Sequence, residues 1–583
     1  MATSSIGNVR QLTALMAAHG VTRCVLCPGS RNAPLVHTLS QMPGMECRPV
    51  TDERSAGFAA LGWAARTGAP VAVCVTSGSA LLNLHPAVAE AFYRKLPLLV
   101  LSADRPASWI GQQDGQTLPQ PGAFGSLVRL CVNLPESATE NDWHANRLIN
   151  EALLELRHRG GGPVHINIPL REPLFDMTEA PLPRPRVIRR TEAGEREAAQ
   201  PELADLLRRC PRRLLLLGQL ERPLLLPREW EGKHLPVVGE HLCNSTCTCR
   251  QPDTLIGTDP RQELAPDLLL TVGGCLLSKR LKKLLRTHPP REHWHLGSEG
   301  ELVDTFCCLT RCLEGEPADL LRYLAETADA GDATYERLWQ QKPAAFPLRP
   351  PRPFSPQFSQ QFSSQPPSQL SQQRPSPFPR QLSPQLSKQF PSQSPPQPPC
   401  GMSLVGRLLH DLPRETVLHL GNSSAVRYAQ LFPLPEGVRT VCNRGVNGIE
   451  GSLSAALGYA MGDPRLHLLL CGDLSFFYDM NALWMEGISP RVRILLLNNG
   501  GGGIFSTLPG MPENPCIEAR HSTSAEGWAR SCGFRYRAIR TEEESEQALR
   551  TLLDPSSESP VLVEAFTSRE EDARLLRQFL TEH

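Results

Sequence analysis

The chain has 583 residues, with 60 lysine and arginine side chains against 60 aspartate and glutamate side chains, so its formal net charge is zero. Hydrophobic residues make up 40% and charged residues 21%, which is ordinary for a globular protein of several domains. Zero net charge argues against a general polyanion binder, because nucleic-acid-binding proteins usually carry a basic excess.

The 18 cysteines are spread over the whole chain, and no secretory signal precedes them, since residues 1–20 lack a basic segment followed by a long apolar one. The longest apolar runs are short, such as residues 468–471, and a bilayer span needs about 20 residues. We therefore expect a cytoplasmic protein in a reducing compartment, without a disulfide framework and without a membrane partner.

Short apolar runs that end in Gly, Ser, Asn or Asp recur along the chain. We predict strands at residues 71–75, 98–101, 214–217, 268–272, 468–471 and 494–497. Such runs suit strands that are buried on both faces, as in a parallel sheet. Helix-compatible stretches, including residues 87–95 and 146–158, lie between them, which predicts an α/β fold with helices flanking parallel sheets. In these sheets ligands bind beyond the carboxyl ends of the strands.

Residues 347–399 depart from this pattern, because Pro (16), Gln (12) and Ser (11) together occupy 39 of the 53 positions. Proline blocks helices and sheet ladders, so we predict a disordered insert. Its scattered phenylalanines leave a partner-binding role open, although a spacer is the favoured interpretation. With a hinge at residues 181–185, the sequence predicts three α/β domains, at 1–180, 190–340 and 400–583.

The C-terminal domain carries the sharpest motif, in which Gly472-Asp473 and Asn498-Asn499 end two successive predicted strands. The Asp473 carboxylate, the Asn499 amide oxygen and the Gly501 carbonyl are the hard oxygen ligands that Mg²⁺ prefers. A helix that begins after Asp473 would direct free N–H groups at a diphosphate. The pattern resembles the signature of thiamine diphosphate (ThDP) enzymes, although turns alone would also explain these dipeptides.

A second motif, in residues 52–62, places Glu53 between a loop and a Gly/Ala-rich helix. The same resemblance implies that Glu53 is catalytic and exchanges a proton with N1′ of the cofactor's aminopyrimidine. Taken alone, Asp-Glu-Arg is more often a solvated charge run. The two motifs together, each in the expected context, favour the catalytic interpretation.

A third set of motifs narrows the family. Residues 27–35 read Cys-Pro-Gly-Ser-Arg-Asn-Ala-Pro-Leu, which resembles the PGSR-x-APL loop of the 2-succinyl-5-enolpyruvyl-6-hydroxy-3-cyclohexene-1-carboxylate (SEPHCHC) synthases. Further matches follow in order at residues 76–80, 103–106, 116–122, 278–280, 421–427, 443–445, 448–451, 472–475 and 504–506. The resemblance covers all three domains, omits only the insert, and implies the three-domain ThDP-enzyme fold with pyrimidine-binding, central and diphosphate-binding domains.

The resemblance implies ThDP-dependent decarboxylation of 2-oxoglutarate and 1,4-addition of the resulting succinyl-semialdehyde carbanion equivalent to isochorismate, in menaquinone biosynthesis. It also implies Mg²⁺ or Mn²⁺, no nucleic-acid partner, and a homodimer or homotetramer with the cofactor between subunits. Another ThDP-dependent 2-oxo acid decarboxylase or carboligase, such as an acetolactate synthase, is the alternative enzyme. A degenerate ThDP-fold scaffold that binds partners through the insert is the non-enzymatic alternative.

The resemblance also assigns site residues. The two substrates carry carboxylates, which arginine binds with bidentate geometry. The implied substrate-binding residues are Ser30, Arg31, Arg105, Gln116, Lys279, Arg280, Ser423, Arg427, Arg444, Ile504, Phe505 and Leu508. The implied cofactor-binding residues are Glu53, Ser77, Gly78, Asn83, Gly472, Leu474, Ser475 and Ile504, and the implied metal ligands are Asp473, Asn499 and Gly501. Gly115 stands where many family members have Asn, so one polar contact is expected to be lost or supplied differently.

Two cysteine groups have spacings that need an interpretation. Cys24 and Cys27 show the CxxC spacing of redox and zinc sites, but they lie in a predicted buried strand, so we interpret them as core residues. Cys243, Cys247 and Cys249 form a looser cluster that we interpret as structural, with zinc left open.

Overall fold

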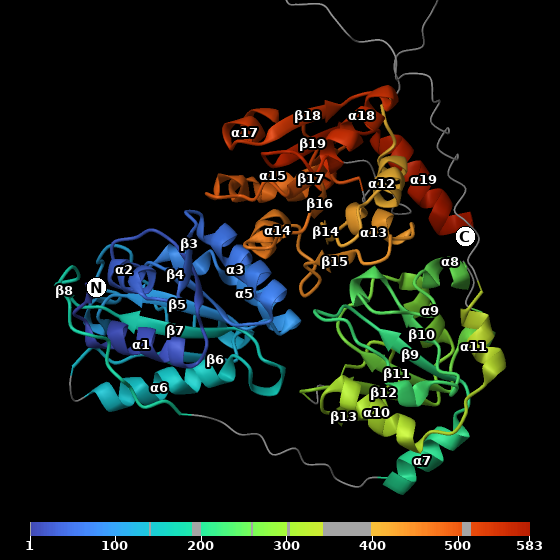
Figure 1. Ribbon diagram of the computed structural model, residues 1–583, viewed down its shortest axis with the longest axis horizontal. Helices are drawn as coiled ribbons and strands as arrows, with labels where there is room; N and C mark the ends of the chain where they lie inside the picture. Colours follow the sequence, from blue (N-terminus) through green and yellow to red (C-terminus); the bar gives the residue numbers. More distant parts are fainter. Residues whose placement is uncertain are drawn as a thin grey trace, which may run out of the picture.

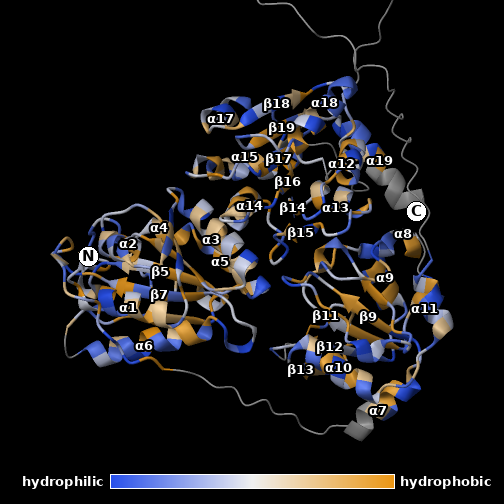
Figure 2. Ribbon diagram, in the orientation of Figure 1, coloured by the Kyte–Doolittle hydropathy of each residue, from blue (hydrophilic) through white to orange (hydrophobic). Residues whose placement is uncertain are grey.

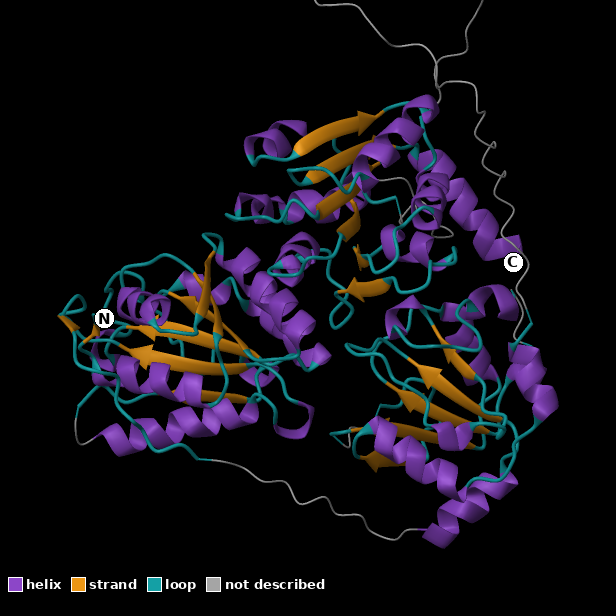
Figure 3. Cartoon of the chain, viewed as in Figure 1, coloured by secondary structure: helices purple, strands orange, loops and turns teal. Residues whose placement is uncertain are grey.

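The computed structural model describes residues 2–138, 141–188, 200–257, 261–299, 303–341, 398–503 and 515–582. Three parallel sheets, each flanked by helices, form three bodies along the chain (Figures 1 and 3). This arrangement confirms the predicted α/β class. Residues 347–397 of the predicted insert lie outside the described residues, as do Ile504, Phe505 and Leu508.

The N-terminal body, blue and cyan in Figure 1, has a six-stranded parallel sheet in the order β3-β2-β4-β5-β7-β6. Alternate strand residues face α3 and α5 on one side and α1 and α6 on the other, so both faces are buried. The strands are β2 (Arg23–Leu26), β3 (Glu46–Pro49), β4 (Val71–Val75), β5 (Leu98–Asp104), β6 (Leu130–Asn133) and β7 (Val164–Pro169). The helices are α1 (Gly7–Ala18), α2 (Ala33–Gln41), α3 (Glu53–Thr67), α4 (Ser79–Leu82), α5 (His85–Arg94) and α6 (Asp142–Glu155), with 3₁₀ turns η1 (Ala107–Trp109), η2 (Gly125–Leu127) and η4 (His158–Gly160). A separate antiparallel pair joins β1 (Thr3–Ser4) to β8 (Met177–Thr178).

The central body, green to yellow in Figure 1, has a five-stranded parallel sheet in the order β10-β9-β11-β12-β13. The strands are β9 (Arg213–Leu217), β10 (Val237–Gly239), β11 (Leu268–Val272), β12 (Glu292–Gly297) and β13 (Arg311–Glu314). The helices are α7 (Gln200–Arg209), α8 (Pro252–Ile256), α9 (Lys279–Thr287), α10 (Pro317–Thr327) and α11 (Ala333–Trp339), with 3₁₀ turns η5 (Arg228–Trp230), η6 (His241–Cys243) and η7 (Gln262–Leu264).

The C-terminal body, orange to red in Figure 1, has a six-stranded parallel sheet in the order β15-β14-β16-β17-β19-β18. The strands are β14 (Val417–Leu420), β15 (Arg439–Cys442), β16 (His467–Gly472), β17 (Val492–Asn498), β18 (Arg535–Ile539) and β19 (Val561–Phe566). The helices are α12 (Gly401–His410), α13 (Ser424–Gln430), α14 (Ser452–Ala460), α15 (Asp473–Tyr478), α16 (Pro515–Glu518), α17 (Glu526–Ser531), α18 (Glu542–Leu553) and α19 (Arg569–Glu582), with the 3₁₀ turn η8 (Met480–Trp484).

Every apolar run for which we predicted a strand lies within a strand of the structure. Residues 71–75 and 268–272 coincide with β4 and β11, and the other runs lie inside β5, β9, β16 and β17. Figure 2 shows hydrophobic residues concentrated on these strands. The predicted helix at 87–95 begins two residues earlier and ends at Arg94, because Lys95 adopts a left-handed conformation (φ 56°) that terminates the helix.

Small residues bring the N-terminal and C-terminal bodies together at helices α3 and α14, which lie side by side in Figure 1. A Cβ atom added at Gly62 would lie 2.0 Å from the carbonyl oxygen of Ala455, and one at Gly458 would lie 2.0 Å from that of Ala59. The two helix backbones therefore pack more closely than side chains with a Cβ at these positions would allow. This contact fixes the N-terminus of α3, where Glu53 lies, relative to the C-terminal sheet.

In the part of the chain that the structure describes, no helix combines the length and the apolar character needed to cross a bilayer.

We expect Gly458→Ala to lower the unfolding free energy by about 1–3 kcal/mol, because the new methyl group must push the two helices apart. Gly527→Ala is the matched control, since a Cβ there meets no atom within 4 Å. Urea unfolding of both variants checks this. Equal midpoints for Gly458→Ala and the wild type would contradict the close packing.

Candidate active site

The residues predicted to bind a metal lie together at the carboxyl edge of the C-terminal sheet. Asp473 is the first residue of α15, and its Oδ2 accepts hydrogen bonds from the backbone N–H groups of Asn499 (3.1 Å) and Gly501 (3.0 Å). Its Oδ1 accepts from the N–H of Leu474 at 2.7 Å. Because β16 and β17 pair in parallel, the loops that follow them meet at one edge.

The donor set at this edge fits a hard divalent cation. The Oδ1 atom of Asn499 is buried and has no hydrogen-bond partner among the described residues. Gly501 has φ 149°, and a Cβ there would lie 2.7 Å from the carbonyl oxygen of Glu518, so the loop requires glycine. A carboxylate, an amide oxygen and a backbone carbonyl are ligands of the type that Mg²⁺ takes in proteins.

His521 is a neighbour of Asp473 that the sequence did not indicate. Its Nε2 lies 3.3 Å from Oδ2 of Asp473. Burial raises the pKa of Asp473, while backbone N–H groups and His521 act in the opposite direction. A cation bound at this carboxylate would favour its ionised form.

Glu53 occupies the first position of α3 and is partly exposed. Asn83 donates a hydrogen bond from Nδ2 to its Oε2 at 3.4 Å. The next residue, Arg54, donates to the carbonyl oxygen of Tyr478 at 2.7 Å, and its guanidinium lies 4.9 Å from the centre of the Tyr478 ring. The N-terminus of α3 is thereby anchored at the last residue of α15, the helix that Asp473 begins.

The predicted cofactor residues of the N-terminal body form a compact loop. Ser77 is 2% exposed, and its Oγ is buried without a partner among the residues described. The N–H of Gly78 donates to Oε1 of Gln120 at 2.8 Å. A Cβ at Gly78 would lie 3.2 Å from the backbone of Gln116, so Gln116 packs directly on this glycine. The structure thus brings Ser77, Gly78 and Gln116 together.

Arg31 and Arg105 follow two strands of the N-terminal sheet, and exposed Ser30 precedes Arg31. Arg31 is 6% exposed and donates to the carbonyl of Leu170 (3.0 Å) and to the largely exposed carboxylate of Glu172 (3.1 Å).

Arg105 contacts the segment in which this sequence departs from the family pattern. Its Nε lies 3.0 Å from the Asp114 carboxylate and donates to the Gly115 carbonyl at 2.8 Å. Asp114 and Gly115 therefore hold Arg105, whereas the sequence alone predicted only a lost or altered contact here.

Arg427 and Arg444 form a pair of cations at the tails of β14 and β15. Ser423, which has a positive φ of 72°, precedes α13 and accepts a hydrogen bond from Arg427 at its carbonyl (3.0 Å). Burial lowers the pKa of Arg427, and the charge of Arg444 lowers it further. Within the described residues, neither guanidinium has a carboxylate within 4.0 Å. Two neighbouring cations with no carboxylate beside them in the described part of the chain favour an anionic ligand.

Lys279 and Arg280 begin α9 in the central body. Lys279 is exposed, whereas Arg280 donates to the carbonyl of Asp253 at 3.0 Å. Burial lowers the pKa of Arg280, and Asp253 opposes that effect. The predicted substrate role of Lys279 and Arg280 stays a prediction.

Gly472, Leu474 and Ser475 surround Asp473. Gly472 caps α15, and Ser475 is buried and donates from Oγ to the carbonyl of Ile449 at 2.6 Å. This bond ties the start of α15 to the loop before α14.

The two cysteine groups contain none of the predicted site residues. Cys24 and Cys27 are buried, and burial raises the pKa of both thiols, which agrees with a core role. The Sγ atoms of Cys243 and Cys247 lie 3.4 Å apart. In the described part of the chain, no group of three His, Cys, Asp or Glu side chains could hold a metal ion.

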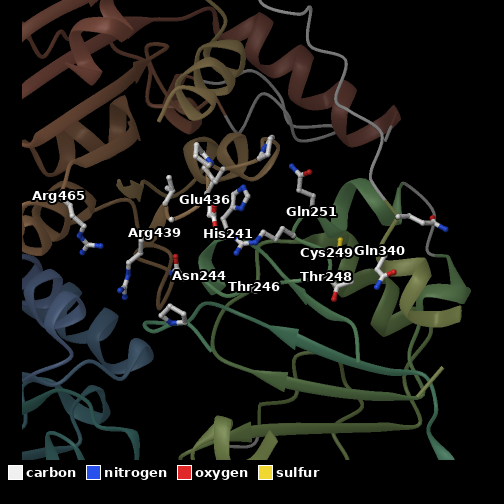
Figure 4. A pocket seen from close by; sticks show the side chains of 18 residues that line it. His241, Asn244, Thr246, Thr248, Cys249, Gln251, Gln340, Glu436, Arg439 and Arg465 are labelled. Atoms are coloured by element: carbon white, nitrogen blue, oxygen red, sulfur yellow. The ribbon is translucent and has the colours of Figure 1, made fainter. Parts of the chain in front are cut away.

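A cavity of about 750 Å³ lies between the central and C-terminal bodies, and Figure 4 shows the side chains that line it. Arg439, Arg465 and buried His241 face it, and burial lowers the pKa of His241 to about 4, so the imidazole is neutral. None of the predicted site residues lines this cavity. The candidate site therefore lies outside this cavity, at the loops that follow the carboxyl ends of the strands.

Comparisons with known proteins agree with the motifs. The family described as "Thiamine pyrophosphate enzyme, N-terminal TPP binding domain" matches residues 9–122, and "Thiamine pyrophosphate enzyme, C-terminal TPP binding domain" matches residues 421–565. The chain is 45% identical to the SEPHCHC synthase of Bacteroides thetaiotaomicron, over 98% of both chains. It is 33% identical to that of Flavobacterium johnsoniae, over 99% of both.

A solved structure shows the same fold. The ThDP-dependent 4-hydroxybenzoylformate decarboxylase of Rhodococcus jostii RHA1 superposes with a TM-score of 0.66 over 96% of this chain and 99% of that one. The sequence identity is 19%, so the likeness concerns the fold alone.

We expect Asp473→Asn to weaken Mg²⁺ binding by more than about 100-fold, because it removes a carboxylate ligand of the metal. Loss of a group that only supports such a ligand typically costs ~10–100-fold in metal affinity. Magnesium titration of ThDP binding measures this. Asp554→Asn, at a surface carboxylate, is the control and should bind as the wild type does. An unchanged titration for Asp473→Asn would place the metal elsewhere.

Proposed function

The chain belongs to the SEPHCHC synthase family, and we propose that it condenses 2-oxoglutarate, with loss of CO₂, with isochorismate in menaquinone biosynthesis. The arrangement of β15, β14, β16 and β17 supports this most directly. These adjacent parallel strands direct the Arg444, Arg427, Asp473 and Asn499 segments to one edge of the sheet. In this proposal, the two arginines bind substrate carboxylates at the same sheet edge at which Asp473 and Asn499 would hold a metal-bound diphosphate.

The described residues fit ThDP with a divalent cation. Asp473, Asn499 and Gly501 would hold Mg²⁺ or Mn²⁺, and the cation would hold the diphosphate. The Asn499 oxygen that lacks a partner among the described residues and the buried Ser77 hydroxyl are the polar atoms that such a ligand would satisfy. When bound, ThDP supplies the nucleophilic carbon and the electron sink for decarboxylation.

Glu53 and the arginines carry the remaining roles in this proposal. The Glu53 carboxyl holds and releases a proton at N1′ of the aminopyrimidine, and Asn83 orients that carboxyl. Arg427 and Arg444 bind substrate carboxylates, because guanidinium groups stay charged and match carboxylate geometry. Arg31 and Arg105 are further candidates for carboxylate binding, and Ile504, Phe505 and Leu508 for the apolar wall that excludes water.

The proposal extends to assembly and location. We infer a homodimer or homotetramer in the cytoplasm, in which Glu53 of one subunit completes the site that Asp473 begins in another. The family resemblance supports this arrangement.

The direct assay incubates the purified chain with 2-oxoglutarate, isochorismate, ThDP and Mg²⁺ and follows isochorismate loss. We expect consumption that depends on ThDP, on the cation and on 2-oxoglutarate. Pyruvate in place of 2-oxoglutarate tests an acetolactate-synthase-like activity. Isochorismate that persists in the complete mixture would refute the proposed function.

We expect Glu53→Gln to lower kcat by at least about 10²-fold while ThDP still binds, because the variant keeps the side-chain shape but loses the proton carrier. Glu46→Gln, at a partly exposed carboxylate on β3, is the matched control. Stopped-flow turnover measures the loss in kcat, and a ThDP titration shows whether the variant still binds the cofactor.

The same variant tests the subunit arrangement. Glu53→Gln and Asp473→Asn should each be inactive, but co-refolded mixtures of the two should regain about a quarter of wild-type activity, since about half of randomly formed dimers hold one intact site of two. No recovery in verified hybrid dimers would show that both residues of a site come from one subunit.

A further inference from the structure

The short segment of residues 443–446, which carries Arg444, is held by side chains from the two other bodies. Glu90 of α5 is 1% exposed, and its two carboxylate oxygens accept the N–H groups of Gly445 (3.0 Å) and Val446 (2.8 Å). A Cβ at Gly445 would lie 2.9 Å from the Glu90 carboxylate. The segment after Arg444 therefore rests directly on a helix of the N-terminal body.

Arg94, one turn further along α5, holds the residue before Arg444. Its Nη1 donates to Oδ1 of Asn443 at 2.9 Å. Its Nε and Nη2 donate to the two carboxylate oxygens of Glu221 in the central body, at 2.8 and 3.0 Å. Burial alone would lower the pKa of Arg94, but Glu221 and Glu90 raise it above its ordinary value, so the guanidinium stays charged.

The C-terminal body completes the chain of contacts through Asn422. Its Nδ2 donates to the carbonyls of Asn443 and Gly448, both at 2.6 Å. Its Oδ1 accepts from Nη1 of Arg444 at 2.9 Å. Arg94 therefore donates a hydrogen bond to the Asn443 side chain, and Asn422 donates one to the Asn443 carbonyl. Asn422 also accepts a hydrogen bond from the Arg444 guanidinium and so orients it.

We propose that Arg94, braced by Glu90 and Glu221, is a positioning residue that sets where Arg444 presents its guanidinium to a substrate carboxylate. This inference rests on the proposed function, since it deepens the role of Arg444. The Arg94 side chain is 3% exposed and acts through Asn443. Displacement of a binding group by about 1 Å can cost about 10²-fold in rate, so a buried clamp of this kind matters for catalysis.

A double-mutant cycle tests the proposal with the full-length enzyme. Arg94→Lys keeps the charge but loses the bidentate geometry and the reach to Asn443. We expect it to raise the KM of one substrate about tenfold, with a smaller change in kcat and unchanged ThDP affinity. In an Arg444→Met background the same change should alter that KM less than about twofold, because contacting residues that act through one another are not additive.

Lys95→Met is the matched control. Lys95 follows Arg94, and its Nζ lies 2.7 Å from the carboxylate of Glu299 in the central body, so this variant disturbs the same interface away from residues 443–446. Both KM values should stay within about twofold of the wild type. If Arg94→Lys does not fold, Gly445→Ala tests the proposal from the other side, since its Cβ would press on Glu90 and should raise the same KM.

The outcomes distinguish failure of the positioning role of Arg94 from failure of the substrate role of Arg444. A tenfold effect of Arg94→Lys that is equally large in the Arg444→Met background means that Arg94 acts on folding or elsewhere, and it overturns the positioning role alone. Unchanged KM values for Arg444→Met itself overturn the substrate role of Arg444, and the positioning role falls with it. An effect of Arg94→Lys that is confined to enzymes containing Arg444 supports the proposal.

Discussion

Parallel pairing of β15, β14, β16 and β17 is the constraint on which the candidate site depends. In a parallel sheet every strand ends at the same edge, so chemistry that is scattered along the sequence converges without long loops. Asp473 follows β16, and its carboxylate accepts the N–H groups of Leu474, Asn499 and Gly501 there. Arg427 and Arg444 lie at the same edge because they follow β14 and β15, which pair in parallel.

Within the described residues, the arginines of the candidate site differ in whether a carboxylate lies beside them. Arg31 and Arg105 have acidic partners in Glu172 and Asp114, and both partners retain solvent exposure. Arg427 and Arg444 instead contact a carbonyl and an amide oxygen, which satisfy N–H groups without cancelling charge. Neutral acceptors leave the pair able to bind anions.

The junction of the three bodies shows why distant residues bear on that site. Arg94, Glu90 and Glu221 are buried or largely buried charges, and such groups are costly unless each is paired and hydrogen-bonded. Their partners include the Asn443 side chain before Arg444 and the backbone N–H groups of Gly445 and Val446 after it, so the position of that loop is coupled to the packing of the bodies. The cavity at His241 lies in another part of the same interface and shares no predicted residue with the site.

The sequence alone determined the fold class, most strand positions and the motif residues, because apolar runs and Gly-Asp or Asn-Asn tails are local signals. Runs such as 71–75 and 268–272 coincide with strands for this reason. The family resemblance then supplied the ligand set around Asp473 and the catalytic assignment of Glu53. Only the tertiary structure decided that His521 faces Asp473, that Asp114 holds Arg105, and that Arg94 reaches Asn443 across 349 positions. The first two contacts join loops within one body, and the third joins two bodies. All three depend on how strand-tail loops and bodies pack in space, and no local sequence pattern encodes which of their side chains become neighbours.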